Sequence, residues 1–217
     1  MKKHLIAVGA LLSMTTPALA HHPLGGLPME TVAHGVLSGV GHPILGFDHL
    51  FFVALVGIAA LYTGYRRIAP GAYIAAMLVG TLVMSLGLAL PAVEIVIGLS
   101  LLVLGAVVLA GRALSIGPAV VLFVLFGMFH GSAFGGSIAA QEAGIGGGVL
   151  VGYLIGLGVT QYLVALAAGW VVGTVLKAKE ASAVQARLAG AVVVGVGVFL
   201  TLENTEGLVF AAMGWGI

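Results

Sequence analysis

The sequence predicts an all-α integral membrane protein, with six transmembrane helices in one compact bundle after a cleaved signal peptide. Composition is the first reason: 61% of the 217 residues are hydrophobic and 7% are charged, whereas about 25% are charged in an ordinary soluble domain. Six apolar stretches that approach or exceed the ~20 residues needed to cross a bilayer are the second. The third is that the positive charges collect in alternate connections between these stretches.

The N-terminus has the pattern of a secretory signal peptide. Two lysines precede an apolar stretch from Leu5 to Leu12, and Ala18 and Ala20 mark a small-residue cleavage site. An uncleaved first helix is the alternative, but its apolar stretch is about half the length of a span. The expected division is a signal peptide at 1–20, an outer N-terminal segment at 21–42 and a six-helix transmembrane domain at 43–217.

The six expected spans are Pro43–Gly64, Ala69–Leu90, Ala92–Gly111, Ile116–Ile138, Gly148–Val175 and Leu188–Leu202, the last being short. Proline suits the first turn of a helix, so the first span is expected to begin at Pro43. The preceding segment 31–41 and the tail 208–217 are each too short to cross alone. Glycines repeat every four residues in the fourth and fifth spans, and such a spacing lets helix backbones touch. They are Gly127, Gly131, Gly135, Gly152 and Gly156.

Charge placement predicts the orientation. The positive charges after residue 20 are Arg66, Arg67, Arg112, Lys177, Lys179 and Arg187, which follow the first, third and fifth spans. Cytoplasmic loops collect Lys and Arg, so these connections are expected inside. With six spans, both ends of the mature chain then face the periplasm, across the inner (plasma) membrane. Most acidic residues fall in the outer half.

The stretch from His42 to His49 holds two histidines and the only aspartate of the chain, at the start of an apolar run. Ionisable groups are costly in a bilayer and mark functional sites. Asp48 and His49 are expected roughly 8–9 Å along the first span, at 1.5 Å per residue. Glu94 lies in the first turn of the third span, and His130 lies some 12 Å before the outer end of the fourth. We therefore expect four ionisable groups from three helices to meet in one outer layer.

These residue types point to a divalent transition metal, because imidazole suits zinc, copper, iron and nickel and a carboxylate adds compensating charge. The expected ligands are His42, Asp48, His49, Glu94 and His130. One of the three residues His42, Asp48 and His49 can point away from the ion. It would then fix the tautomer of an imidazole ligand instead of binding the metal itself. The chain has no cysteine, which excludes disulfides and thiolate metal sites.

Several motifs resemble those of the HupE/UreJ family of membrane permeases. The stretch His42-Pro-Ile-Leu-Gly-Phe-Asp48-His49 is similar to the family signature H-P-x-x-G-x-D-H. Glu94 followed six residues later by Ser100 resembles the pattern of the third span, and Phe129-His130-Gly131 that of the fourth. Gly152-Tyr153 and Thr160 resemble the fifth span, so the resemblance extends over essentially the whole chain.

The resemblance implies a secondary transporter, not an enzyme, that takes up nickel or cobalt ions and is associated with hydrogenase and urease systems. The sequence departs from the pattern in two places. Hydrogenase-linked members often have further histidines and a glutamate after the histidine of the fourth span, where this chain has Ser132, Phe134 and Ser137. A histidine common in their fifth span is replaced near Val164. The choice of ion is therefore the least determined property.

We expect the ion to be captured by His21, His22 or Glu30, partly dehydrated at the histidine and aspartate site, and passed inward. The expected inner oxygen ligands are Ser100, Ser132, Thr160 and Gln161, although serine and threonine in spans often bond to helix carbonyls instead. No permanently bound cofactor and no nucleic-acid partner are expected. The sequence is compatible with a homo-oligomer and with a monomer. It contains no phosphate-cradling loop and gives no sign of an ATPase subunit.

Two other classes use the same residues. A haem or electron-transfer membrane protein would take His42, His49 and His130 as axial ligands. An intramembrane hydrolase would activate Ser132 or Ser137 through His130 or His49. Residues two apart on a helix point about 200° apart, which makes a pair of His130 and Ser132 geometrically poor.

Overall fold

The computed structural model describes residues 28–139 and 146–214, and this part of the chain is helical with no strands. The helices are α2 (Val32–Leu45), α3 (Phe47–Leu61), α4 (Ala69–Ser85), α5 (Val93–Leu109), α6 (Ile116–Ala139), α7 (Gly147–Trp170), the π-helical turn η2 (Val171–Val175) and α8 (Val184–Ala212). The predicted signal peptide, His21, His22 and Glu142 lie outside the described residues.

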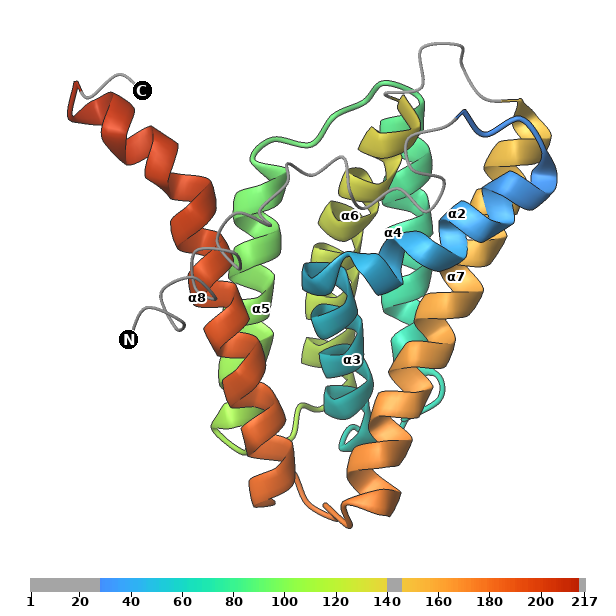
Figure 1. The fold of residues 1–217 in the computed structure, drawn as a ribbon. Coiled ribbons are helices and arrows are strands. Elements are labelled where there is room, and N and C mark those ends of the chain that lie inside the picture. The colour runs from blue at the N-terminus through green and yellow to red at the C-terminus, as the bar shows by residue number, and fades with distance from the viewer. Residues whose placement is uncertain (1–27, 140–145, 215–217) are drawn as a thin grey trace, which may run out of the picture.

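Helix α3 lies at the centre of the bundle and contacts every other helix (Figure 1). Beyond its first turn, which carries Asp48 and His49, its side chains are apolar on all sides, and those of Phe52, Val53, Leu55 and Val56 are fully buried. Around it, the most extensive packing joins α4 to α6, α2 to α7 and α5 to α8. A helix that is hydrophobic all round can be accommodated only when other helices enclose it, and α3 meets this condition.

Among the described residues, three helices are long and apolar enough to cross a membrane: Ile116–Ala139, Gly147–Val175 and Val184–Glu206. The bent pair α2 and α3 makes a fourth if it counts as one span. Helices α4 and α5 are apolar but have 17 residues each, or about 25 Å at 1.5 Å per residue. The described part of the chain is thus all-helical, with three or four apolar spans as in a membrane protein, and the six-span arrangement stays a prediction.

The outer faces of the bundle are apolar, as expected for contact with lipid. Val121 on α6, Leu163 on α7 and Phe199 on α8 each expose about three fifths of their surface. Exposed apolar patches of this extent are rare on soluble monomers. They support a membrane environment independently of the lengths of the helices.

The expectation that the first span begins at Pro43 is wrong. Pro43 lies inside α2, two residues before that helix ends. The chain then turns by 82° between α2 and α3, and Gly46 is the residue between them. Its ψ of 97° is extended and so ends the helical conformation. The axis of α2 runs obliquely across the upper part of the bundle in Figure 1.

The last helix also differs from its expected span. Helix α8 runs from Val184 to Ala212 and has 29 residues, whereas the expected span covered only Leu188–Leu202. Its C-terminal part includes residues that were expected to form a separate short tail. In Figure 1 this part leans away from the rest of the bundle.

The glycine repeats bring backbones together as predicted. Added β-carbons at Gly127, Gly131 and Gly135 on α6 would each collide with carbonyl groups of α4. Gly152 and Gly156 on α7 approach α2 in the same way, and Gly35 and Gly39 on α2 reciprocate. These contacts hold α2 against α7 and α6 against α4. They thereby fix the positions of α2, which carries His42, and of α6, which carries His130.

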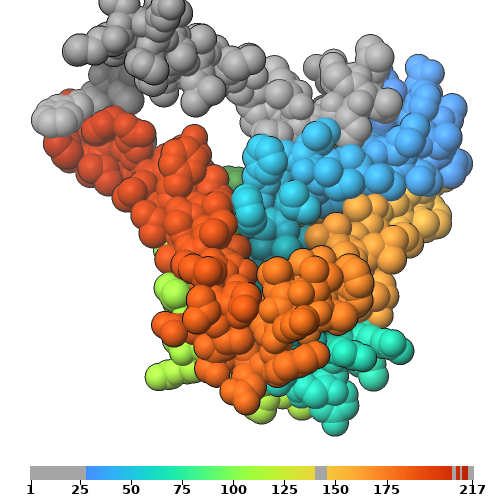
Figure 2. Space-filling model, turned by 60° about the horizontal axis from the view of Figure 1, so that its bottom comes forward, coloured from blue at the N-terminus to red at the C-terminus, as the bar shows by residue number. Residues whose placement is uncertain are grey.

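The positive charges gather at one end of the bundle. The connections that carry them, between α3 and α4, α5 and α6, and α7 and α8, all lie at the bottom in Figure 1. Figure 2 brings this end forward and shows the orange residues that join α7 to α8 beside the turquoise residues that join α3 to α4. A hydrogen bond from the Tyr62 hydroxyl to the Ala178 carbonyl links these two connections.

Candidate functional site

The bend at Gly46 brings His42 and His49 together from different helices. Their ring centroids lie 6.2 Å apart, with His42 in α2 and His49 in the first turn of α3. The two histidines thus meet across the bend and do not lie along one straight helix. A β-carbon at Gly46 would come within 3.0 Å of His49 Cδ2 and 3.3 Å of Asp48 Oδ1. A side chain at this bend would therefore press on both His49 and Asp48.

His49 and His130 are in direct contact. Their Nδ1 atoms are 2.8 Å apart, and the Nε2 atom of His130 lies 2.9 Å from the Ser100 hydroxyl. The Ser100 hydroxyl donates its proton to the Ile97 carbonyl at 2.6 Å. Because a hydroxyl has one proton to give, Ser100 accepts from the Nε2–H group of His130. The Nδ1 atom of His130 then has a lone pair, which accepts from the Nδ1–H group of His49.

This chain of hydrogen bonds leaves the Nε2 atom of His49 facing Asp48. The distance from His49 Nε2 to Asp48 Oδ2 is 3.7 Å. In neutral His49 this nitrogen carries a lone pair, and an ionised carboxylate is an acceptor only. Two acceptors that face each other are stabilised by a cation between them, either the proton of an imidazolium or a metal ion. The geometry thus favours a positive charge at this point.

Aromatic rings enclose the histidine pair. Phe52 stacks on His130 with 4.3 Å between centroids and 18° between planes, and Phe134 lies 4.1 Å from the ring of His49. His130 is fully buried, and 5% of His49 is exposed. The side chain of Asp48 retains 22% exposure. The site is therefore closed around His130 and more open at Asp48.

His42 is held by α7 and α6. Its Nδ1 atom lies 2.9 Å from the Tyr153 hydroxyl and 3.4 Å from the Ser137 hydroxyl, and its ring meets Phe134 edge-on at 4.9 Å. Tyr153 is fully buried. Sequence reasoning assigned Tyr153 no role beyond its place in a motif. A buried tyrosine hydroxyl usually has a hydrogen-bond partner, and this rule alone points to the contact.

Glu94 stands apart from the histidine pair. It is exposed in the first turn of α5, and its charge acts on Asp48 and His49 only through space. Ser100, which touches His130, lies six residues further along α5, or about 9 Å at 1.5 Å per residue. Of the expected outer layer, the structure brings Asp48, His49 and His130 together and leaves Glu94 nearer the helix end.

The remaining candidates are spread along the bundle. Glu30 is exposed just before α2. Gln161 is fully buried on α7; its Oε1 atom accepts from the Tyr73 hydroxyl at 2.8 Å, and its Nε2 atom has no partner among the described residues. The buried Ser132 hydroxyl likewise has none. Thr160 is half-buried. Tyr73 was not among the residues predicted from the sequence, and its ring lies 6.1 Å from that of His130.

Among residues 28–139 and 146–214, no group of three or more His, Asp or Glu side chains is close enough to hold a metal ion. Both ring nitrogens of His130 are used inside the protein, which leaves it oriented as a partner of His49. Among the described His, Asp and Glu side chains, the closest pair of atoms that both have a lone pair for a cation is Asp48 Oδ2 and His49 Nε2, with His42 and Glu94 further away. Two such atoms are too few to enclose a metal ion.

The geometry gives no support to a serine nucleophile. The Ser137 hydroxyl donates to the Phe134 carbonyl at 2.8 Å, and the Ser132 hydroxyl has no hydrogen-bond partner among the described residues. Neither hydroxyl is therefore hydrogen-bonded to His130 or His49, the bases that such a mechanism would need. An axial haem pair would need two imidazoles facing each other across the cofactor, whereas His49 and His130 are in hydrogen-bond contact.

Comparison with known proteins gives one family and one curated relative. The family model described as "HupE / UreJ protein" matches residues 9–200. A protein from Rhizobium leguminosarum bv. viciae, named "Protein HupE", is 31% identical over 127 residues, which are 58% of this chain and 64% of that protein. The match thus spans less than two thirds of the relative. No solved structure matches the chain.

Proposed function

Because the chain belongs to the HupE/UreJ family, we propose that it is a permease for a divalent transition-metal cation, Ni²⁺ or Co²⁺. The family is associated with uptake of these two metals. In this proposal the ion moves from the periplasm to the cytoplasm through the inner membrane. Both mature termini are periplasmic, and residues 1–20 are removed as a signal peptide. The ion is cargo, and the protein needs no resident cofactor.

The observation that carries the proposal is the facing pair of Asp48 and His49. Two ligands at about 2.1 Å each from a metal ion are at most about 4.2 Å apart. The 3.7 Å between His49 Nε2 and Asp48 Oδ2 therefore allows one ion to touch both atoms. One imidazole and one carboxylate match the preference of nickel and cobalt for nitrogen and oxygen ligands.

His130 and Ser100 act in this proposal as positioning residues. They hold the Nδ1–H group of His49 and so direct its Nε2 lone pair toward Asp48. Metal-ligating histidines nearly always donate their other N–H to a partner, which fixes the tautomer and the ring orientation. The partner in this chain is a second histidine instead of the usual carboxylate or carbonyl.

Further ligands complete the coordination only in part. We propose that His42 and Glu94 approach the ion from the outer side, with water in the remaining positions. A permease must release its ion, so binding must be weak or divided among several sites. A pair of strong ligands suits this requirement better than a closed cage. Glu30, His21 and His22 supply the capture step.

Inward transfer is proposed to follow the buried polar side chains below the histidine pair. Gln161 and Tyr73 are hydrogen-bonded to each other, and the ring of Tyr73 lies beside His130. Ser132 and Thr160 offer further oxygen atoms. No ATPase is needed, because the membrane potential is worth about 4.6 kcal/mol for a divalent cation at 100 mV. That energy supports roughly a thousand-fold accumulation at equilibrium.

Metal uptake by cells tests the proposal. We expect Asp48→Asn and His49→Ala to abolish accumulation of radioactive Ni²⁺ or Co²⁺, because each removes one of the two facing ligands. His34→Ala is the matched histidine control, since the ring of His34 accepts only from the nearby Glu30 backbone in the described structure. Glu203→Gln is the matched acidic control, because Glu203 is exposed on α8.

Competition by unlabelled Zn²⁺, Cu²⁺ and Mn²⁺ in the same cells identifies the preferred ion. Expression is followed by immunoblot, so that a loss of protein is separated from a loss of transport. Wild-type accumulation by both site variants at equal expression would show that the ion does not pass between Asp48 and His49. Retained transport in the two control variants is required for the proposal to stand.

A further inference from the structure

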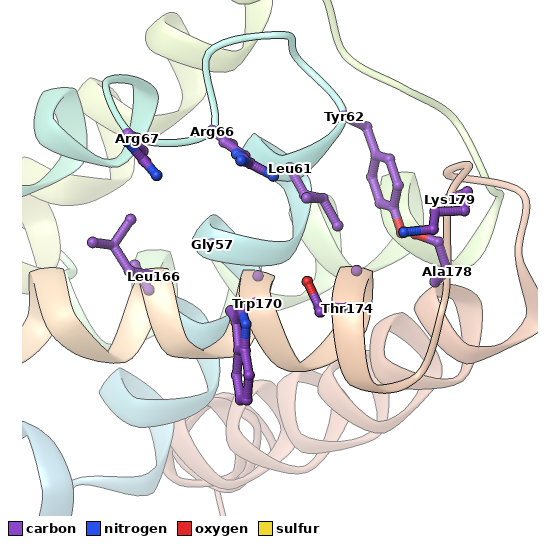
Figure 3. A pocket seen from close by; sticks show the side chains of 13 residues that line it. Gly57, Leu61, Tyr62, Arg66, Arg67, Leu166, Trp170, Thr174, Ala178 and Lys179 are labelled. Carbon is purple, nitrogen blue, oxygen red and sulfur yellow. The ribbon is translucent and has the colours of Figure 1, made fainter.

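A basic pocket lies at the end of the bundle opposite Asp48. The cavity measures about 470 Å³ and lies between the end of α3, the connection that follows it, and the end of α7 with η2. Figure 3 shows Arg66 and Arg67 on one side of it and Leu166 of α7 and Thr174 of η2 on the other, with Lys179 beside Tyr62. The volume falls in the range of ligand pockets, about 300–1,000 Å³.

The charges of this pocket are not neutralised within the described structure. The side chains of Arg66, Arg67 and Lys179 are exposed and make no hydrogen bond or ion pair with a described residue. Glu180 is adjacent in sequence but contacts the Ser182 hydroxyl. The C-terminal ends of α3 and α7 each contribute about half a negative charge. Three formal positive charges outweigh these two helix ends, so the pocket favours an anion.

The pocket is separate from the cation site. At its inner wall the backbones of α3 and α7 touch, because a β-carbon at Gly57 would collide with the Ala165 carbonyl and one at Gly169 would lie 2.9 Å from the Gly57 carbonyl. This crossing lies along α3 between the pocket and His49. A cationic rim would in addition repel a divalent metal ion. The pocket therefore has a different ligand from the one proposed for Asp48 and His49.

A turn in the backbone just before Lys179 places this residue at the pocket. Lys177 has a φ of 56°, in the left-handed region that residues other than glycine rarely adopt. This turn reverses the chain after η2, and the Ala178 N–H group then donates to the Val172 carbonyl at 3.0 Å. The Tyr62 hydroxyl holds the Ala178 carbonyl at 3.1 Å. Lys179 follows directly and lines the pocket.

The surroundings favour a lipid as the source of the anion. Trp170 lines the pocket and exposes 60% of its surface, and tryptophan is enriched where a membrane protein meets the headgroup layer. Leu61 and Leu166 add apolar surface, and Leu163 continues it outside along α7. We propose that this pocket binds the phosphate of an anionic phospholipid through Arg66, Arg67 and Lys179, with the glycerol and upper acyl chain against Trp170 and Leu166. Basic pockets between helices on the cytoplasmic side bind such headgroups.

Fluorescence quenching in vesicles tests this site. The chain has two tryptophans, so a Trp215→Phe background leaves Trp170 as the single reporter in the full-length protein. We expect phosphatidylglycerol brominated near the carboxyl end of its acyl chains to quench Trp170 at low mole fraction and with saturation. Phosphatidylcholine brominated in the same way should quench only in proportion to its abundance. Equal quenching by the two lipids would overturn the proposal without any variant of the pocket.

Matched double variants test the residues. Arg66→Gln with Lys179→Gln removes two positive charges that line the pocket, whereas Arg112→Gln with Lys177→Gln removes two from the same end outside it. We expect the first pair to weaken the preference for phosphatidylglycerol about 25-fold, roughly fivefold for each cation, and the second to retain it. Equal losses in both pairs would show general surface attraction and reject the pocket.

Competition by inorganic phosphate shows whether the anion in the pocket is a lipid headgroup or a free phosphate ion. At constant ionic strength, we expect millimolar phosphate to leave the quenching by brominated phosphatidylglycerol unchanged, because it lacks the apolar part that contacts Trp170 and Leu166. Displacement by phosphate but not by chloride would assign the pocket to a free anion and overturn the lipid assignment. None of these measurements depends on metal transport.

Discussion

The Nδ1 atoms of His49 and His130 are 2.8 Å apart, at the meeting point of α3 and α6. This contact commits one nitrogen of each ring to the other ring, and Ser100 occupies the second nitrogen of His130. His49 is the only member of the pair that has a nitrogen directed at a carboxylate. In the proposed site, the contact therefore makes His49 the ligand and His130 the residue that orients it, although both are histidines in the same layer.

We predict that His130→Ala weakens metal binding without removing it. The change leaves the Nδ1–H group of His49 without its acceptor, so the ring loses its fixed tautomer and orientation. Loss of such a partner typically costs 10–100-fold in metal affinity. The measurement is the concentration dependence of Ni²⁺ uptake, in which KM should rise by that factor.

Ser100→Ala separates positioning from packing. It removes the acceptor of the His130 Nε2–H group with little change of volume, so a smaller rise of KM in the same direction is expected. Ser85→Ala is the control, because the Ser85 hydroxyl, like that of Ser100, donates to the carbonyl three residues earlier but bonds to no histidine in the described structure. If His130→Ala abolishes uptake as completely as His49→Ala in well-folded protein, His130 is a ligand and the assignment is wrong.

We predict that Gly46→Ala impairs transport by moving the two ligands. The backbone angles of Gly46, φ −83° and ψ 97°, are open to alanine. The new β-carbon, however, would lie 3.0 Å from His49 Cδ2 and 3.3 Å from Asp48 Oδ1. Both contacts are tighter than normal packing, so the ring and the carboxylate must shift.

Gly71→Ala is the matched control for Gly46→Ala. Gly71 lies in α4, and a β-carbon there meets nothing within 4 Å. We expect Ni²⁺ uptake to fall severalfold in Gly46→Ala and to stay unchanged in Gly71→Ala, at equal expression. Unchanged uptake in both would indicate that the spacing of Asp48 and His49 tolerates displacement.

The helices could be predicted because hydropathy and length determine them. The expected stretches 116–138 and 148–175 agree with α6 and with α7 and η2 to within one residue. The bend could not be predicted, because the rule for Pro43 concerns a helix start and this proline lies near a helix end. The extended backbone at Gly46 depends on α2 packing against α7 through Gly35 and Gly39, which are more than 100 residues away from α7 in the chain.

The members of the site could be predicted more readily than their roles. Depth along each helix placed His130 near His49, and this is confirmed. The depth of a residue along its helix does not say in which direction its side chain points, however. Depth alone therefore assigned Glu94 to the same layer and left Ser100 as a general polar candidate. The bond between His42 and Tyr153 joins residues 111 positions apart, and no local pattern encodes it.

We predict that Gly39→Ala destabilises the fold. A β-carbon at Gly39 would collide with the Tyr153 carbonyl and lie 2.8 Å from the Leu157 nitrogen, so α2 must move away from α7. Overpacking of this kind typically costs 1–3 kcal/mol. The free energy of unfolding in detergent should fall by about that amount. Gly117→Ala, where a β-carbon meets nothing within 4 Å, should change it little.

The separation of charge between the two ends predicts which side each end faces. The chain has no cysteine, so an introduced cysteine is its one thiol and no native cysteine has to be removed first. Arg112 and Glu206 are both exposed, and they lie on the connection from α5 to α6 and near the far end of α8, respectively. Because lysine and arginine mark the cytoplasmic side, a membrane-impermeant maleimide should label Glu206→Cys in intact spheroplasts. Arg112→Cys should react only after permeabilisation. The reverse pattern would place Asp48 and His49 in the cytoplasmic half and turn the proposed uptake into export.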